Sequence, residues 1–324
     1  MSEPTLLYLT RADVIAAGVG MADVIGALEV AFREHGEGRT ELPPKPGVHT
    51  RPGAFSHAMP AYVPALHAVG IKWVSGYPDN AARGLPRITG LLILNDEETG
   101  LPLALMDCVW ITAVRTGAAT ALAAKYLARP DSTSVGILGC GVQGRSNLAA
   151  LAAQFALTRV VAYDPLPGQA GRFAAEAQAT YGVEAIATDD PRAAVSGCDL
   201  VVTAGDDRVR HCTIQPGWLD AGSFASLVDM DVAWEDRAMQ EVDKFITDDL
   251  GQYQSYVARG FHFQGTPPLY GLLGEIVAGK KPGRASAAER TMTCNIGCAI
   301  GDMATASLVY ARALAQGLGQ RLPL

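Results

Sequence analysis

The pattern of hydrophobic and polar positions changes character near residue 116. Before that point, residues 10–36 carry apolar side chains at helical spacing, interrupted near Gly18 and Gly20, with Thr10 placed to cap the first turn. Shorter apolar runs follow at 54–59, 68–75, 88–95 and 101–106, and an acidic stretch ending in Gly100 supplies a turn between the last two. These features predict an α+β part with an antiparallel sheet.

Beyond residue 116, strand-like and helix-like segments alternate. After a helix at 117–127, the pattern predicts strands at 133–138, 159–163, 184–187 and 199–204, separated by helices at 142–156, 167–180 and 190–196. Further short strands are expected at 224–228 and 244–247, and a last helix at 297–317. This order is typical of a doubly wound parallel sheet. The fold class predicted is therefore α/β, with a Rossmann-type sheet and a second, α+β domain that the C-terminal helix completes.

A glycine motif lies directly after the strand predicted at 133–138. Gly139, Gly141 and Gly144 fit the G-x-G-x-x-G pattern, in which the glycines allow a tight turn, close approach to a pyrophosphate and close helix packing. Asp164 ends the next predicted strand, where a carboxylate accepts a hydrogen bond from a ribose 2′-hydroxyl and repels a 2′-phosphate. The next four residues, Pro-Leu-Pro-Gly, include no cation. The motif predicts NAD(H), preferred over NADP(H); the alternative is a purely structural turn.

Composition narrows the class of protein. The 324 residues suit two domains, and 49% hydrophobic with 18% charged residues is ordinary for a globular protein. A net charge of −7 argues against nucleic acid as a partner. We expect no membrane partner, because there is no signal-peptide pattern and no apolar run of about eighteen residues. Six cysteines without a C-x-x-C suit a reducing compartment, so a cytoplasmic protein without a metal site is expected.

Several separated motifs occur in a fixed order along nearly the whole chain. They comprise the segments 70–80, 84–86, 96–107, 112–119, 139–144, 273–279 and 295–304. Through them the chain resembles the ornithine cyclodeaminase/μ-crystallin family. The resemblance implies a homodimer, with residues 1–115 and 295–324 as the substrate-binding and dimerisation domain and residues 116–294 as the NAD-binding domain. It also implies chemistry at the Cα–N bond of a small amino or imino acid, with hydride moving to or from the nicotinamide.

The resemblance assigns candidate roles to single residues. Lys72 and Arg115 match the family's cationic clamp for the substrate α-carboxylate, although a surface lysine and a structural ion pair remain the alternative. Asp164 matches the ribose contact. The other cofactor contacts implied are Arg115, Thr116, Gly139, Gly141, Val142, Gln143, Gly144, Thr203, Val228 and Asn295.

Asp231 aligns with the family's catalytic aspartate, and Lys72 is the second residue placed in the catalytic set. Reduction of an imine needs a protonated nitrogen. A nearby carboxylate can stabilise the positive charge on that nitrogen and can transfer the proton to and from it. Asp229 lies two positions away, and in an extended segment both carboxylates would share one face. Asp231 is favoured by the alignment alone; a loop carboxylate that caps the next helix is the alternative.

The departures from the cyclodeaminase pattern concern the substrate end. Lys45 replaces an arginine, His57 a glutamate, Glu235 a lysine and Asn295 a serine. Losing an acid while keeping cations makes the pocket less suited to the distal ammonium of a diamino acid, although His57 could also be a packed neutral histidine. The expected substrate-binding residues are therefore Lys45, His57, Lys72 and Arg115. A substrate with a second carboxylate or with a small uncharged side chain is favoured.

These observations predict an NADH-dependent reductase of a small α-imino acid, or an enzyme that reductively aminates an α-keto acid, of the iminosuccinate/oxaloacetate or pyruvate type. Hydride would reach Cα, with Asp231 handling the nitrogen proton. Two alternatives remain. One is an ornithine-type cyclodeaminase that recycles its NAD internally, and the other is a μ-crystallin-like small-molecule binding protein.

Overall fold

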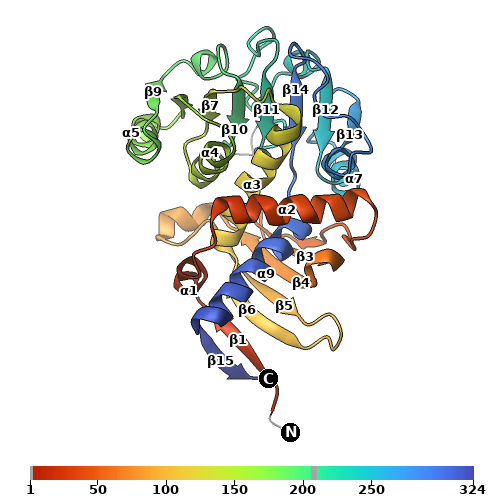
Figure 1. Ribbon diagram of the computed structural model, residues 1–324. Helices are drawn as coiled ribbons and strands as arrows, with labels where there is room; N and C mark the ends of the chain where they lie inside the picture. The colour runs from red at the N-terminus through yellow and green to blue at the C-terminus, as the bar shows by residue number, and fades with distance from the viewer. Residues whose placement is uncertain (1–2, 206–209) are drawn as a thin grey trace. The chain divides into compact units, whose positions relative to one another are not determined.

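The computed structural model describes residues 3–205 and 210–324 (Figure 1). The chain divides into two compact units. The first consists of the described residues as far as Arg115 together with Cys298–Leu324, and the second of the described part of Thr116–Gly297. Each unit contains one β-sheet, and the two sheets differ in type.

The sheet of the first unit has the strand order β15-β1-β6-β5-β4-β3-β2. Its strands are antiparallel except for the pair β1 and β6, which is parallel. The antiparallel hairpin predicted before residue 107 is present, whereas the sequence pattern did not predict β1, β2 and β15. The strands are β1 (Thr5–Leu9), β2 (Gly47–Val48), β3 (Phe55–Val63), β4 (Ala68–Gly76), β5 (Ile88–Asn95), β6 (Pro102–Asp107) and β15 (Gln320–Pro323).

Helices α1 (Arg11–Ala16), α2 (Met21–Gly36) and α9 (Ala299–Gln316) belong to the same unit, and α9 packs against α2 and against β3 and β4 (Figure 1). Thr10 caps α1 through a capping box with Asp13, as the sequence suggested. The single interrupted helix predicted at 10–36 is two helices, because the chain turns at Gly18, whose φ is +68°.

The two faces of this sheet are chemically different along β4 and its neighbours. Lys72 pairs with Met59 on one side and with Leu92 on the other, and all three side chains are buried. The next residue, Trp73, pairs with Leu91, and both of these side chains are exposed. Because successive strand residues point to opposite faces, one face forms the interior of the unit and the other is apolar but uncovered.

The second unit has eight parallel strands in the order β13-β12-β14-β11-β10-β7-β8-β9. The order reverses between β7 and β10, which makes this the switch point where such sheets bind ligands beyond the carboxyl ends of the strands. The strands are β7 (Ser134–Leu138), β8 (Arg159–Tyr163), β9 (Glu184–Thr188), β10 (Leu200–Thr203), β11 (Phe224–Leu227), β12 (Lys244–Thr247), β13 (Leu269–Leu272) and β14 (Thr291–Cys294).

The predicted doubly wound sheet is therefore confirmed, and β13 and β14 are additions to it. The remaining helices are α3 (Val109–Leu127), α4 (Val142–Gln154), α5 (Gln169–Tyr181), α6 (Asp236–Met239), α7 (Leu250–Ala258) and α8 (Leu273–Val277). Helix α3 begins eight residues before the helix predicted at 117–127, and the helix predicted at 190–196 is a short 3₁₀ turn, Pro191–Ala194. Within the described residues, no helix is long and apolar enough to cross a bilayer.

Candidate functional site

The glycine loop that follows β7 has the geometry its sequence requires. Gly139 has a φ of +104°, and a Cβ there would lie 2.4 Å from the carbonyl oxygen of Ala204. A Cβ on Gly144, in the first turn of α4, would lie 2.2 Å from the carbonyl oxygen of Gly139. Gly141 is exposed and would meet nothing within 4 Å. The first and third glycines are thus needed for packing, and the second leaves open space for a ligand at the start of α4.

Asp164, directly after β8, is tied to this loop. Its Oδ2 accepts a hydrogen bond from the backbone N–H of Cys140 at 2.8 Å, and its Oδ1 accepts one from Leu166 N–H at 2.9 Å. One cation comes near: Arg145 of α4 donates to the carbonyl of Cys140 and, at 2.6 Å, to Glu176. The pKa of Arg145 is raised above its ordinary value, chiefly by the hydrogen bond to Glu176. This guanidinium is therefore already neutralised by a carboxylate.

Two residues predicted to contact the cofactor carry buried polar atoms without a partner among the described residues. These atoms are Oε1 of Gln143, in the first turn of α4, and Nδ2 of Asn295, just after β14. The Oδ1 atom of Asn295 accepts a hydrogen bond from Thr293 Oγ1 at 3.0 Å, which fixes the amide. Since an unsatisfied buried polar atom costs about 1–3 kcal/mol, both atoms fit a site that a polar ligand completes.

The other predicted cofactor contacts differ in exposure. Val142 is 66% exposed beside Gly141, whereas Thr116 is buried. Thr203 ends β10 and donates a hydrogen bond of 2.5 Å to Asp229 Oδ1, and the N–H of Val228 donates to the carbonyl of Thr203 at 2.8 Å. Thr203 and Val228 thus lie at the carboxyl ends of neighbouring strands, the edge to which the glycine loop also belongs.

In the first unit, Lys72 and Arg115 share one carboxylate oxygen. Lys72 Nζ lies 2.7 Å and Arg115 Nε 3.1 Å from Oδ1 of Asp302, in the first turn of α9. Lys72 Nζ also donates to Thr112 Oγ1 at 3.4 Å. Burial lowers the pKa of the Lys72 ammonium, and the attraction of Asp302 opposes that effect. The two predicted clamp residues are therefore brought together, and the surface position considered for Lys72 is wrong because the residue is fully buried.

His57 and Lys45 belong to the edge of the same sheet. His57 on β3 pairs with Val74, so its side chain shares the inner face with Lys72. Its ring is buried and stacks on Phe55 with 4.4 Å between centroids. Gly47 of β2 pairs with His57, and Lys45 precedes that pair by two residues, half-buried. The ring of His57 is thus packed on Phe55, which fits the alternative interpretation of this residue.

Asp229 and Asp231 do not share a face. The segment after β11 is a turn rather than an extended strand, and Met230 between them has a φ of +60°. Asp229 accepts hydrogen bonds from Thr203 Oγ1 and from Gly205 N–H at 2.9 Å. Asp231 accepts from His262 Nδ1 and from Phe263 N–H, both at 2.8 Å. The predicted extended geometry is therefore wrong. The left-handed residue between the two carboxylates redirects the chain and separates them.

Asp231 is almost completely enclosed in the second unit. Burial by itself would raise the pKa of its carboxyl group, but the hydrogen bonds from His262 and Phe263 and the charge of Arg210, whose Nη1 lies 3.9 Å away, outweigh this and lower it. The carboxylate accordingly stays ionised at neutral pH. Its side chain is 1% exposed, against 10% for that of His262.

Comparison with known proteins decides the family. The family model described as "Ornithine cyclodeaminase/mu-crystallin family" matches residues 7–317. The chain belongs to this family. The alanine dehydrogenase of Archaeoglobus fulgidus is 34% identical, over 98% of each chain. Among solved structures, the Δ1-pyrroline-2-carboxylate reductase of Thermococcus litoralis, in complex with NADH and L-proline, is 33% identical with a TM-score of 0.88, covering 97% of this chain and 99% of that one.

A second solved structure, an archaeal alanine dehydrogenase dimer with bound NAD, is 32% identical with a TM-score of 0.90, covering 99% of this chain and 100% of that one. The resemblance and the fold class predicted from the sequence are thus confirmed. The expected enzyme class, an NAD-dependent oxidoreductase acting on C–N bonds, agrees with these relatives. Their substrates differ from one another, so family membership leaves the substrate of this chain open.

This family member contains functional candidates that the sequence analysis did not single out. Asp302 lies within the last family motif but is 230 residues from Lys72, so only the folded chain reveals the contact. His262 and Arg210 contact Asp231 from separate loops and belong to no motif. Glu235, one of the departures from the cyclodeaminase pattern, occupies the N-cap position of α6 without a side-chain capping hydrogen bond and pairs with Arg237 at 3.1 Å.

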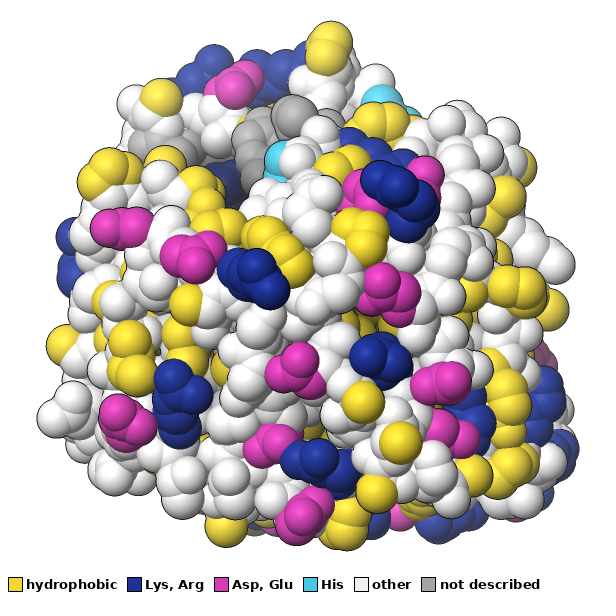
Figure 2. Space-filling model, turned by 90° about the horizontal axis from the view of Figure 1, so that it is seen from above, with side chains coloured by type: hydrophobic (Ala, Val, Ile, Leu, Met, Phe, Trp, Pro, Cys, Tyr) yellow, Lys and Arg dark blue, Asp and Glu magenta, His cyan; other side chains and the backbone are white. Residues whose placement is uncertain are grey.

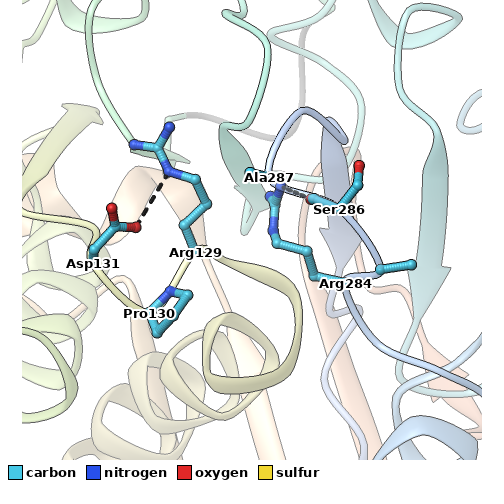
Figure 3. A pocket seen from close by; sticks show the side chains of 7 residues that line it. Arg129, Pro130, Asp131, Arg284, Ser286 and Ala287 are labelled. Carbon is cyan, nitrogen blue, oxygen red and sulfur yellow. Dashed lines mark hydrogen bonds and ion pairs between the residues drawn. The ribbon is translucent and has the colours of Figure 1, made fainter.

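A surface pocket of about 350 Å³ in the second unit contains two arginines, Arg129 and Arg284 (Figure 3). Arg129 pairs with Asp199, at the amino end of β10, while Arg284 donates to backbone carbonyls that include Leu127 at 2.6 Å and Ser223 at 3.2 Å. The pocket therefore lies at the amino ends of the strands, opposite the glycine loop, and its guanidinium groups hold the fold together. On the face in Figure 2, acidic and basic side chains are interspersed. No metal-binding cluster occurs among the described residues.

Proposed function

We propose that this protein is an NADH-dependent oxidoreductase that reduces the C=N bond of a small α-imino acid, formed from an α-keto acid and ammonia or supplied as a cyclic imine. The observation that carries the proposal is the buried group of Lys72, Arg115 and Asp302, in which two cations share one carboxylate oxygen. With Lys72 protonated, the three charges add to +1. A buried net charge is unfavourable unless a counter-ion is supplied, and a substrate carboxylate supplies one.

The second unit fits a dinucleotide. The loop at Gly139–Gly144 leaves room beside Gly141, and the buried, unpartnered atoms of Gln143 and Asn295 offer an acceptor and a donor. Asp164 is fixed by two backbone N–H groups where a ribose would lie, and the nearby Arg145 is engaged by Glu176. A fixed carboxylate and a neutralised cation favour NAD(H) over NADP(H).

We assign separate roles in the reduction to different residues of the chain. When bound, NADH supplies the hydride that reaches Cα. Lys72 and Arg115 hold the α-carboxylate, which fixes the orientation of Cα and lowers the entropic barrier. The carboxylate of Asp231 stabilises positive charge on the protonated nitrogen, through its own charge and through the imidazole that it binds.

The side chain of the substrate is expected to be short or to carry a second carboxylate. His57 shares a sheet face with Lys72, and Lys45 lies two residues before the strand that pairs with His57. This end of the site thus offers positive charge and an imidazole where a diamino acid would need an acid. Oxaloacetate with ammonia is the first substrate to test, and pyruvate with ammonia the second.

A homodimer is the expected assembly. On the outer face of the first unit's sheet, Trp73, Leu91 and Ile93 are 45%, 44% and 36% exposed and lie on adjacent strands. A continuous apolar face of this kind is usually covered by another protein surface, and a second copy of the same face is self-complementary. The dimeric state of the archaeal alanine dehydrogenase supports this expectation.

The test is to follow NADH absorbance with ammonia and oxaloacetate, pyruvate or glyoxylate, and with cyclic imino acids. NADH consumption by the wild type, abolished in Asp231→Asn with NADH binding retained, is the expected result. A higher KM in Lys72→Met would place the carboxylate at the cation pair. Ornithine converted without net change in NADH would instead identify a cyclodeaminase. NADH binding without turnover of any compound would identify a binding protein.

A further inference from the structure

The hydrogen bonds of Asp231 leave it poorly placed to carry a proton itself. Its Oδ1 accepts from the imidazole of His262 and its Oδ2 from the N–H of Phe263, each at 2.8 Å. Arg210 Nη1 adds positive charge 3.9 Å from Oδ2. A carboxylate that accepts a hydrogen bond at each oxygen and lies beside a cation is stabilised as an anion, and protonating it would weaken these interactions.

The partner of Asp231 has the properties that a proton carrier needs. An imidazole has two ring nitrogens, so one can exchange a proton while the other keeps its hydrogen bond to the carboxylate. The side chain of His262 is also the more accessible of the two, 10% exposed against 1% for Asp231. Because Nδ1 of His262 faces the carboxylate, it carries a proton in the neutral ring, and Nε2 is left as the atom that exchanges protons.

We propose that His262 is the catalytic residue that carries the proton of the substrate nitrogen, and that Asp231 is its positioning residue. The inference rests on the proposed function and refines the role given there to Asp231. In the reductive direction, Nε2–H of the imidazolium donates its proton to the lone pair of the imine nitrogen. The C=N π electrons then move to nitrogen as Cα accepts hydride from NADH, which gives the amine and NAD⁺. Neutral His262 regains its proton from solvent.

The surroundings of the imidazole suit this exchange. The rings of Phe261, Phe263 and Tyr256 lie 4.5, 5.8 and 5.8 Å from it, between centroids. Among the residues that the structure describes, ion pairs at this centre join Asp231 to His262 and to Arg210, and Arg210 is itself paired with Asp236. These rings hold the imidazole in place while its side chain stays 10% exposed, so it can still exchange a proton with solvent.

The first experiment compares His262→Gln with the wild type over a range of pH, with the substrate that gives the highest rate. Glutamine can still donate a hydrogen bond to Asp231 but does not titrate. We expect kcat to fall by about 10²–10⁴-fold, the limb of the pH profile that belongs to the proton carrier to disappear, and the NADH dissociation constant to stay unchanged. His35→Gln, whose Nδ1 lies 2.9 Å from Thr40 Oγ1 in the first unit, is the matched control and should leave all three unchanged.

The second experiment needs neither substrate nor NADH. In ¹⁵N-labelled protein, the imidazole nitrogen shifts of His262 should report the Nδ1–H tautomer in the neutral form, and Asp231→Asn should change the tautomer ratio. This result is available even where His262→Gln does not fold.

The outcomes distinguish a failure of this inference from a failure of the proposed function. If the wild type reduces imino acids and His262→Gln keeps kcat within about threefold, or if the Nε2–H tautomer dominates, His262 is a structural partner of Asp231 and this inference is wrong while the proposed function stands. A wild type that reduces none of the imino acids overturns both.

Discussion

Replacing Asp302 with Asn tests whether the buried charges of the first unit depend on one carboxylate. The change preserves the size of the side chain and removes its charge, which leaves Lys72 and Arg115 buried without their shared counter-ion. Removing one partner from a buried ion pair costs about 3–5 kcal/mol. Because the side chain of Asp302 is 0% exposed and that of Lys72 1%, solvent provides little compensation, and we expect a loss at the upper end of this range.

Lys72→Met supplies the matched comparison. It removes one cation but leaves Arg115 and Asp302 as a one-to-one pair 3.1 Å apart, so the free energy of unfolding should stay within about 2 kcal/mol of wild type, in either direction. The double variant should be more stable than Asp302→Asn alone, with a coupling energy of about 1–3 kcal/mol. Glu29→Gln, which removes a partly exposed ion pair with Arg33, should cost no more than about 0.5 kcal/mol.

Urea unfolding followed by circular dichroism measures these differences. A loss of about 3–5 kcal/mol lowers the midpoint by roughly 1 M for m-values typical of such chains. If the two units unfold in separate steps, the shift should fall on one step only. A midpoint for Asp302→Asn that matches wild type, or one for Lys72→Met that lies below the midpoint of Asp302→Asn, would show that the lysine rather than the carboxylate holds the cluster together, and the reasoning would be wrong.

Four other outcomes are expected. Gly144→Ala should lower stability by about 1–3 kcal/mol and weaken NADH binding, because its Cβ would meet the carbonyl oxygen of Gly139. Gly141→Ala should weaken NADH binding but leave stability unchanged, because a Cβ there meets nothing within 4 Å. Fluorescence titration measures the binding of NADH, and thermal unfolding measures the stability. Trp73→Lys should convert a dimer into monomers in sedimentation experiments, and an unchanged mass would place the interface elsewhere. Asp164→Ser should reduce the preference for NADH over NADPH by about tenfold in binding titrations. Folding lowers the pKa of Asp231, so the carboxylate stabilises the folded protein fully above its unfolded-state pKa, and this stabilisation is lost as pH falls through its folded-state pKa. In urea unfolding measured over a range of pH, Asp231→Asn should therefore flatten the fall in the free energy of unfolding at acid pH.

The elements that the sequence predicted well are those with a local signal. The alternating strands and helices from 133 to 204 depend on residues close to one another in the chain. Strand β14, by contrast, is only Thr-Met-Thr-Cys, and all four residues are buried because β11 and β12 flank it. A four-residue run without alternation gives no strand signal by itself. Its place in the sheet is decided by pairing with strands distant in sequence.

The same distinction applies to the candidate site. Lys72 and Arg115 could be named from motifs, but the carboxylate that joins them comes from helix α9, at the other end of the chain. His262 and Asp231 are 31 residues apart in the chain, and no local sequence pattern predicts their contact. The left-handed conformation of Met230, which separates Asp229 from Asp231, is adopted by a residue type that rarely favours it.

Both clusters of buried charge argue for function on energetic grounds. A chain stabilised only by packing would place apolar side chains at Lys72 and Asp302, because well-packed hydrophobic replacements of buried ion pairs are often neutral or stabilising by about 1–4 kcal/mol. The buried Met59 and Leu92 side chains that pair with Lys72 show that its immediate neighbours on this face of the sheet are apolar core. Two groups depart from such a core: Lys72 with Asp302, whose Oδ2 has no partner among the described residues, in the first unit, and the enclosed carboxylate of Asp231 in the second. Under the proposed function these positions serve substrate binding and proton transfer, and the Asp302 and His262 variants test the two clusters independently.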